Sequence, residues 1–288
     1  LKSLYKKGRK DLMINYRGIT LSSTIGKWFT SVLYTALIEI AIERNWMGDF
    51  QSGFTPGSQT NDNVLVLRTI LHRAKKLSHP LKAVFVDLKK AYDMVPRKRL
   101  WSKIAAMGGD GLLTGMLAAM YENDTLSIDV NGDPGGLIKL KRGVKQGCIL
   151  SPLLFNIFIS DLGVALNSGS GICLGSKTIS GLLFADDLLI LGHSVQEIQE
   201  KLKITQDWCH DNKMEINFDK TKILDKEKDR LWPVWNRDKY EEIQSVHSLS
   251  YLGVPISFKG QIQWTYGPHS NQMIARAKKY KSAKKQKI

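Results

Sequence analysis

Two neighbouring aspartates, Asp186 and Asp187, lie inside an otherwise apolar run, GLLFADDLLILG, at 181–192. Burying an unpaired charge is costly, so these carboxylates need a compensating partner. A third carboxylate, Asp87, ends the apolar run at 83–86. A carboxylate that leaves a buried strand is a better metal-ligand candidate than one on a helix surface. We therefore expect the three acids to converge.

Three converging carboxylates would repel one another, by about 4 kcal/mol for a pair 4 Å apart at an effective dielectric of about 20. A divalent cation removes that repulsion, and Mg²⁺ is commonly held by one or two carboxylates together with substrate phosphates. Two such ions, roughly 3.5–4 Å apart, can activate an attacking 3′-oxygen and stabilise a leaving pyrophosphate. The pattern thus predicts metal-dependent phosphoryl or nucleotidyl transfer. The alternative is that Asp186 and Asp187 only form a hairpin turn and that Asp87 only caps the next helix.

The elements that would position these acids mix helices and strands without a regular βαβ order. Apolar spacing predicts helices over 24–45, 61–77, 97–108, 151–166 and 194–214. Short strands are predicted at 81–88, 216–224 and 250–257, with a hairpin over 125–143 around Asn131-Gly132. The run at 181–192 reads as strand, tight turn at the aspartates, and strand. This mixture indicates an α+β domain with an antiparallel sheet.

The charge balance points to a polyanionic partner. The 288 residues include 42 basic and 27 acidic side chains, a formal net charge of +15, which is typical of nucleic-acid binding. The alternative is a soluble, lysine-rich surface. The segment at 273–288 carries seven basic residues from Arg276 to Lys287 and no acid. We expect it to be helical or disordered, or simply a solvated tail.

Other features narrow the setting of the chain. Three scattered cysteines form no zinc-site spacing, which favours a reducing compartment. No apolar run reaches the roughly 20 residues of a membrane span, so no membrane partner is expected. The chain starts with Leu1, which leaves an upstream targeting peptide open.

The order of the acidic motifs resembles that of reverse transcriptases. The stretches AVFVDLKKAYDMV, GVKQGCILSPLLFNIFISDL and FADD follow one another as in this family, and their wording is closest to the non-LTR (LINE-type) retrotransposon enzymes. YRGITLSSTIGKWF resembles the fingers motif YRPISL, and QSGFTPGSQTNDNV resembles QxGFRxGxST. INFDKTKI resembles the NxxKT motif, and YLGVPIS the primer-grip strand. The similarity extends from about Lys10 to about Ser257.

The resemblance implies a right-hand polymerase fold with fingers, palm and a partial thumb, its antiparallel palm sheet backed by helices. We expect fingers at 1–82 and 103–145, and palm at 83–102 (the first acidic motif) and 146–245 (with the FADD hairpin). The primer-grip strand and the start of a truncated thumb with its basic tail would occupy 246–288. Three positions depart from the family pattern: Thr55 stands for Arg, and Gly18 and Ile149 stand for Pro.

The resemblance also assigns catalytic roles. Asp87 and Asp186 would bridge two Mg²⁺ ions, with Mn²⁺ as the alternative metal, and Asp187 would be a more peripheral ligand. Lys220 would be the general acid that protonates pyrophosphate; the alternative is an ordinary exposed lysine.

Nucleotide-binding roles fall on two motifs and the fingers. Backbone N–H groups from Leu88 to Ala91 would face the triphosphate, and Tyr92 would be the steric gate under the sugar, unless it is only core packing. The incoming nucleotide and templating base would meet a pocket lined by Gln146 and Gly147. In the fingers the triphosphate would meet Arg17, with Lys10 as a basic companion.

Primer and template roles complete the assignment. Pro152 would open the helix beneath the template, and Phe184 would touch the last primer nucleotide. Support for the primer strand would come from Tyr251, Leu252 and Gly253.

Two functions follow from different classes. The first is an RNA-directed DNA polymerase that adds dNTPs to the 3′-hydroxyl of a nucleic-acid primer on an RNA template. The second is a catalytically retired, basic protein that serves as a structural RNA-binding subunit of a larger ribonucleoprotein. The nucleus and an organelle such as the mitochondrion are the candidate compartments.

Overall fold

The computed structural model describes residues 2–5, 8–12, 15–130, 133–225, 231–236 and 239–257. The predicted hairpin tip at Asn131-Gly132, the basic segment at 273–288 and the expected start of a thumb lie outside the described residues. The division into fingers and palm by residue range stays a prediction.

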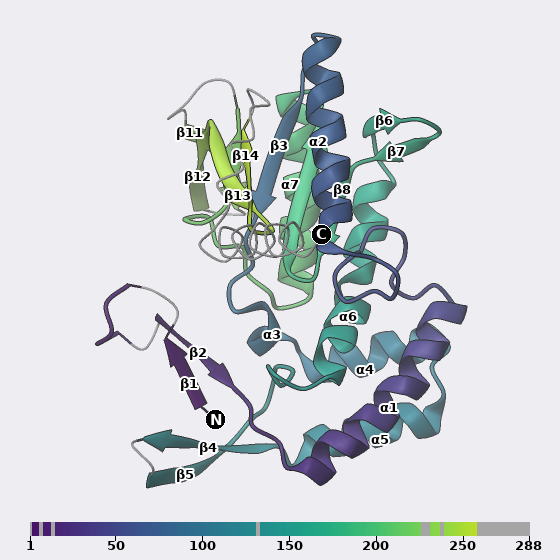
Figure 1. Ribbon diagram of the computed structural model, residues 1–288, viewed down its shortest axis with the longest axis vertical. Helices are drawn as coiled ribbons and strands as arrows, with labels where there is room; N and C mark the ends of the chain where they lie inside the picture. The colour runs from purple at the N-terminus through teal and green to yellow at the C-terminus, as the bar shows by residue number, and fades with distance from the viewer. Residues whose placement is uncertain are drawn as a thin grey trace, which may run out of the picture.

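A six-stranded sheet carries the acidic motifs (Figure 1). Its order is β11 (Leu231–Asn236), β12 (Lys239–Val246), β10 (Lys222–Leu224), β3 (Lys82–Val86), β9 (Asp187–Gly192) and β8 (Gly181–Phe184). Every neighbouring pair is antiparallel except β10 and β12, which are parallel. The predicted α+β class with an antiparallel palm sheet is thus confirmed, with one parallel pair as the exception.

Seven helices complete the described part of the chain: α1 (Thr24–Glu43), α2 (Thr60–Lys76), α3 (Ala91–Met94), α4 (Arg97–Ala106), α5 (Gly111–Glu122), α6 (Leu150–Asn167) and α7 (Val195–Asp211). The five predicted helices are confirmed to within a few residues at their ends. Helix α5 was not predicted, because Gly111 and Gly115 lower its helix propensity and its apolar spacing is weak. Its start is fixed by Asp110, whose side chain accepts the Leu113 N–H.

The two faces of the sheet have different cover. Val84, Val86, Leu188 and Ile190 share a core with α6 and α7. The alternate residues, among them Ala83, Leu189 and Leu191, pack with α2 and with the hairpin of β13 (Ser248–Tyr251) and β14 (Val254–Ser257). This two-residue alternation is the ordinary consequence of strand geometry. It assigns odd-numbered residues of β3 and β9 to the face covered by α2.

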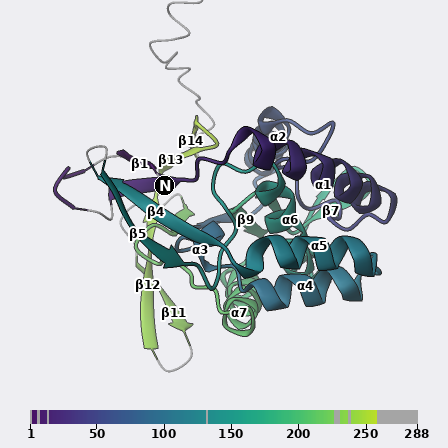
Figure 2. The same ribbon diagram turned by 90° about the horizontal axis from the view of Figure 1, so that it is seen from below.

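The remaining strands form separate hairpins: β1 (Lys2–Tyr5) with β2 (Tyr16–Ile19), β4 (Thr125–Val130) with β5 (Asp133–Lys139), and β6 (Ile172–Leu174) with β7 (Lys177–Ile179). The β1–β2 and β4–β5 hairpins lie on one side of the molecule, and α1, α4 and α5 lie on the other (Figures 1 and 2).

Two strand predictions were wrong in detail. The run 216–224 is a strand only at β10, because the chain turns over Asn217–Thr221 before it. The run 250–257 is not one strand but most of the β13–β14 hairpin. Its two turn residues, Leu252 and Gly253, both have positive φ, as the hairpin turn type with both central residues left-handed requires.

The prediction that no segment is long enough to span a membrane was also wrong. By length and composition alone, α1 and α6 would suffice. The core helix of a folded domain meets the same criterion, and α6 is largely buried. Helix α1 buries Leu33 and Leu37 but leaves Trp28 exposed. The criterion is therefore weak support for a membrane segment in either helix.

Candidate active site

The FADD motif forms the predicted tight hairpin. Phe184 at the end of β8 pairs with Asp187 at the start of β9, so Ala185 and Asp186 make a two-residue turn. The left-handed residue is Ala185, with φ +55°. If the aspartates served only as turn formers, that position would favour Gly, Asn or Asp rather than Ala. Neither aspartate therefore occupies the left-handed position of the turn.

The register of the sheet brings the third acid to the same place. Val86 of β3 pairs with Leu188 of β9, and one step further Asp87 comes opposite Asp187. Directly opposed residues of antiparallel strands lie about 4.5–5.5 Å apart at Cα and point to the same face. Strand pairing therefore brings Asp87 to the same edge of the sheet as Asp187, which lies 100 residues further along the chain. That the three carboxylates converge on a metal stays a prediction.

A turn after α7 brings a lysine to this edge. The Asn217 N–H donates to the Asp87 C=O (2.7 Å), and the Asp87 N–H donates to the Thr221 hydroxyl (3.2 Å). Between them, Lys220 places its Nζ 3.8 Å from Asp87 Oδ2. The alternative that Asp87 only caps the next helix was wrong. The N-cap residue of α3 is Lys90, and no side chain makes a cap hydrogen bond there.

The donor set suits a hard divalent cation. Asp87 and Asp186 are partly exposed and Asp187 is exposed, so the carboxylates keep access to solvent and substrate. Within the described residues, no group of three or more acidic, His or Cys side chains closes around a point that could hold a metal. Mg²⁺ does not need such a cage, because it takes few carboxylates and relies on water and phosphate oxygens. The oxygen ligands present therefore fit this ion.

The residues of the predicted nucleotide pocket contact α3 and the end of the β1–β2 hairpin. Gln146 donates from Nε2 to Asp93 (3.0 Å), and its carbonyl accepts the Thr20 N–H (2.8 Å). Gly147 has φ +100°, and a Cβ there would lie 3.1 Å from both the Ile19 side chain and the Thr20 carbonyl. Gly147 thus packs closely against the end of β2 and the residue after it, and its approach to a nucleotide stays a prediction.

The predicted steric gate is half-buried. The ring of Tyr92 stacks on Phe155 of α6, with centroids 4.7 Å apart and planes at 13°. Its carbonyl accepts the Val144 N–H (2.8 Å), which ties α3 to the motif that contains Gln146. This stacking fixes the orientation of the ring. One face of the ring therefore packs against the core, as the alternative expected, and the steric-gate role of Tyr92 stays a prediction.

The triphosphate-binding run needs one correction. Leu88 is buried and forms an isolated β-bridge with Ile216. Beside this bridge, the Lys89 backbone N–H donates to the Glu215 carbonyl (2.9 Å). That N–H is therefore already used. The other backbone N–H groups of the predicted run are those of Leu88, Lys90 and Ala91, and Ala91 is the first residue of α3.

The two fingers cations have unequal support. The Arg17 backbone pairs with Leu4 in the β1–β2 hairpin, while its side chain lies outside the described residues. Lys10 is exposed, and its Nζ lies 5.6 Å from the centroid of the Tyr5 ring. Because Ile19 touches Gly147, the strand that carries Arg17 leads directly to the nucleotide pocket.

The predicted primer residues surround the same edge. Phe184 is half-buried, with its ring centroid 6.5 Å from that of Phe54. Tyr251 is buried against Phe85 and accepts a hydrogen bond from Asn63 (3.4 Å). Burial raises the pKa of Tyr251, and the nearby negative charge of Asp187 raises it further.

The other predicted primer and template residues lie in a hairpin turn and in the first turn of a helix. Leu252 and Gly253 form the β13–β14 turn, and Pro152 lies in the first turn of α6 as predicted. The positions agree with the predicted contacts to primer and template, which stay predictions.

Sequence reasoning used the motif QSGF only as a family marker and missed Gln51 as a site residue. Its side chain is 3% exposed and bonds to the turn of the FADD hairpin. Thr55, which stands where the family has Arg, donates its hydroxyl to the Gln51 carbonyl (3.0 Å). No sequence signal marked Gln51 beyond its place in that motif, because its burial and its partners are decided by the tertiary structure.

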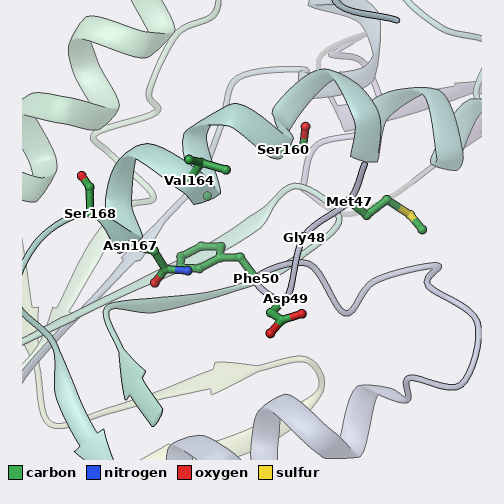
Figure 3. A pocket seen from close by; sticks show the side chains of 9 residues that line it. Met47, Gly48, Asp49, Phe50, Ser160, Val164, Asn167 and Ser168 are labelled. Atoms are coloured by element: carbon green, nitrogen blue, oxygen red, sulfur yellow. The ribbon is translucent and has the colours of Figure 1, made fainter. Parts of the chain in front are cut away.

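A separate hollow lies away from these acids (Figure 3). It has a volume of about 360 Å³ and is lined by the segment after α1 and the C-terminal half of α6, including Met47, Phe50 and Val164. None of the four catalytic candidates, Asp87, Asp186, Asp187 and Lys220, lines it.

Solved structures share this fold. The chain matches apo telomerase from Candida tropicalis with a TM-score of 0.56 at 15% identity, over 82% of this chain and 40% of that one. It also matches telomerase from Candida albicans in complex with a fragment of telomeric RNA, with a TM-score of 0.52 at 14% identity, over 78% and 36%. The right-hand polymerase fold predicted from the motifs is confirmed.

The family profile described as "Reverse transcriptase (RNA-dependent DNA polymerase)" matches residues 5–256. The chain belongs to the reverse transcriptase family. Its relatives include the Pol polyprotein of the R2 element from Popillia japonica, 31% identical over 65% of this chain and 26% of the relative. A Drosophila melanogaster relative, the probable RNA-directed DNA polymerase from transposon BS, is 26% identical over 88% and 28%.

These relatives confirm the predicted LINE-type character of the domain. The chain spans between about a fifth and a quarter of the length of these curated relatives. The similarity therefore establishes a reverse transcriptase domain and not the composition of a whole protein.

Proposed function

We propose that this reverse transcriptase domain copies RNA into DNA by adding dNTPs to a primer 3′-hydroxyl. The observation that carries the proposal is that strand pairing puts Asp87 and the Asp186–Asp187 pair at the same end of the sheet, with the Lys220 Nζ 3.8 Å from Asp87 Oδ2. When bound by Asp87 and Asp186, Mg²⁺ or Mn²⁺ would supply charge neutralisation for the 3′-oxygen and the phosphates. Asp187 would be an outer contributor because it is the most exposed of the three.

Lys220 is the candidate proton donor. The bond formed joins the primer 3′-oxygen to the α-phosphorus, and the bond broken joins that phosphorus to the oxygen that leaves with pyrophosphate. The proton of the 3′-hydroxyl would pass to solvent water at this partly exposed edge. The released oxygen gains a proton, which the Lys220 ammonium can supply at the site edge.

The surrounding residues suit a nucleotide and two strands. Tyr92, fixed by its stacking on Phe155, would exclude a 2′-hydroxyl, while Gln146 and Gly147 would line the base-pair pocket. The net charge of +15 supports binding of an RNA template and a primer through their phosphates. The RNA-bound telomerase of similar fold adds support for the template, and a larger ribonucleoprotein and a nuclear or organellar location remain part of the proposal.

The alternative, a retired RNA-binding subunit, is not favoured. The family match and the intact acidic set point to chemistry. RNA binding through phosphates does not depend on those acids, so the alternative gives them no role.

A primer-extension assay tests the proposal. Purified protein, an RNA template, a DNA primer, dNTPs and Mg²⁺ should give extended primer, and Asp186→Asn should reduce the rate at least about 10³-fold. Asp207→Asn, which removes an exposed carboxylate from α7, is the matched control and should extend normally. A wild-type protein that binds RNA but leaves the primer unextended would refute the polymerase proposal.

A further inference from the structure

The turn of the FADD hairpin has an unfavourable backbone conformation. Ala185 has φ +55°, in the left-handed region that residues with a Cβ avoid. Asp186 follows directly, so the dihedral angles of Ala185 decide where the Asp186 carboxylate lies. A turn held in this state needs a restraint from outside the hairpin.

One side chain supplies that restraint. The Ala185 N–H donates to Gln51 Oε1 (2.8 Å), and Gln51 Nε2 donates to the Ala185 carbonyl (3.2 Å). A single amide thus binds both polar backbone groups of the left-handed residue. The same Oε1 also accepts the Gly53 N–H (2.8 Å), which fixes the orientation of the amide.

The segment that carries Gln51 is itself attached to the hairpin. It exchanges two backbone hydrogen bonds of 3.0 Å with Leu183. At Gly53 a Cβ would lie 2.3 Å from the Ala185 nitrogen, so only glycine permits this approach. Two further buried amides hold the contact: Asn156 of α6 donates to the Gly53 carbonyl (2.6 Å), and Asn63 of α2 donates to the Leu183 carbonyl (3.0 Å).

We propose that Gln51 is a positioning residue for catalysis: it holds Ala185 in the left-handed state and thereby fixes the Asp186 carboxylate. The inference rests on the proposed function, because it concerns the same acid. Gln51 touches neither substrate nor metal in this role. A merely structural glutamine would contribute to folding stability and leave the chemistry per folded molecule unchanged.

The test uses three variants and a matched control. Gln51→Ala removes the clamp, Ala185→Gly removes the need for it, and the double variant combines them. Gln206→Ala removes another buried glutamine, on α7, which takes no part in the Gln51–Ala185 hydrogen bonds. Each protein is measured for primer-extension rate per folded molecule, for the Mg²⁺ concentration giving half the maximal rate, and for amide hydrogen exchange at Ala185.

We expect Gln51→Ala to slow extension by about 10–100-fold and to raise the Mg²⁺ requirement, because a displacement of about 1 Å costs that much. The double variant should recover about tenfold of that loss, since glycine adopts φ +55° freely. Exchange at residue 185 should accelerate in Gln51→Ala and stay slow in Gln206→Ala.

Two results would overturn the clamp: a Gln51→Ala protein that matches Gln206→Ala in rate and Mg²⁺ requirement, or a double variant no better than Gln51→Ala. Hydrogen exchange at Ala185 tests the clamp independently of primer-extension activity. Should wild-type protein fail to extend primers, unchanged exchange at Ala185 in Gln51→Ala overturns the clamp, and accelerated exchange supports it while the polymerase proposal fails.

Discussion

Replacement of Lys220 by Met separates a catalytic role from a surface ion pair. The Lys220 Nζ lies 3.8 Å from Asp87 Oδ2, with side-chain exposures of 59% and 39%. At that distance the attraction is about 1 kcal/mol in a water-like dielectric, and exposed pairs contribute roughly 0–1 kcal/mol to stability. We therefore expect Lys220→Met to change the free energy of unfolding by less than about 1 kcal/mol.

Its effect on chemistry should be far larger. General acid catalysis contributes about 10²–10⁴-fold, so single-turnover dNTP addition should slow by at least about 10²-fold. The control is Lys203→Met, which removes the lysine of an exposed pair with Asp207 on α7. Urea unfolding gives the stability, and rapid-quench primer extension gives the rate.

Comparison of the two lysine variants decides the assignment. A Lys220→Met protein that extends primers within about threefold of the rate of Lys203→Met would refute the general-acid role of Lys220.

Three further predictions concern the surrounding scaffold. Arg97→Met should destabilise the fold by about 3–5 kcal/mol in urea, because the buried guanidinium donates to Asp124 (2.7 Å) and to three backbone carbonyls. Iodoacetamide at pH 8 should label exposed Cys173 quickly and Cys209 only on unfolding, since burial raises the pKa of the Cys209 thiol to about 12; equal labelling would contradict this. Burial raises the pKa of Glu197, but hydrogen bonds from Lys201 and the His193 N–H outweigh it and leave the pKa below its ordinary 4.5. Stability from Glu197 is therefore present above that pH and lost as pH falls through the folded value, and Glu197→Gln should flatten acid unfolding curves there.

Local sequence was sufficient where the deciding interactions are local. The FADD hairpin follows from two short apolar runs around a polar pair, and β8 and β9 form as predicted. Helix α6 follows from continuous apolar spacing with Pro152 in its first turn. Helix α5 escaped prediction because its glycines weaken the local signal, and its burial of Leu117 and Tyr121 is decided by neighbouring helices.

Site residues divide in the same way. The residue types of Asp87, Asp186 and Lys220, with their family motifs, were enough to name them. Their meeting depends on contacts across more than 90 residues: the β3–β9 register for the acids, and the turn bonded to the Asp87 backbone for the lysine. The role of Gln51 had no local signature, because its partners lie 134 residues away.

The sequence by itself determined the family, the chemistry of the acidic set and the strand–turn–strand at FADD, because these depend on residue type and short-range periodicity. Only the tertiary structure decided which distant segments hold the catalytic hairpin in place. It placed the strain of the turn on Ala185 and the restraint on Gln51, and it used the Lys89 N–H within the predicted triphosphate loop. The physical reason is that backbone hydrogen bonds between distant segments carry no side-chain pattern that a sequence records.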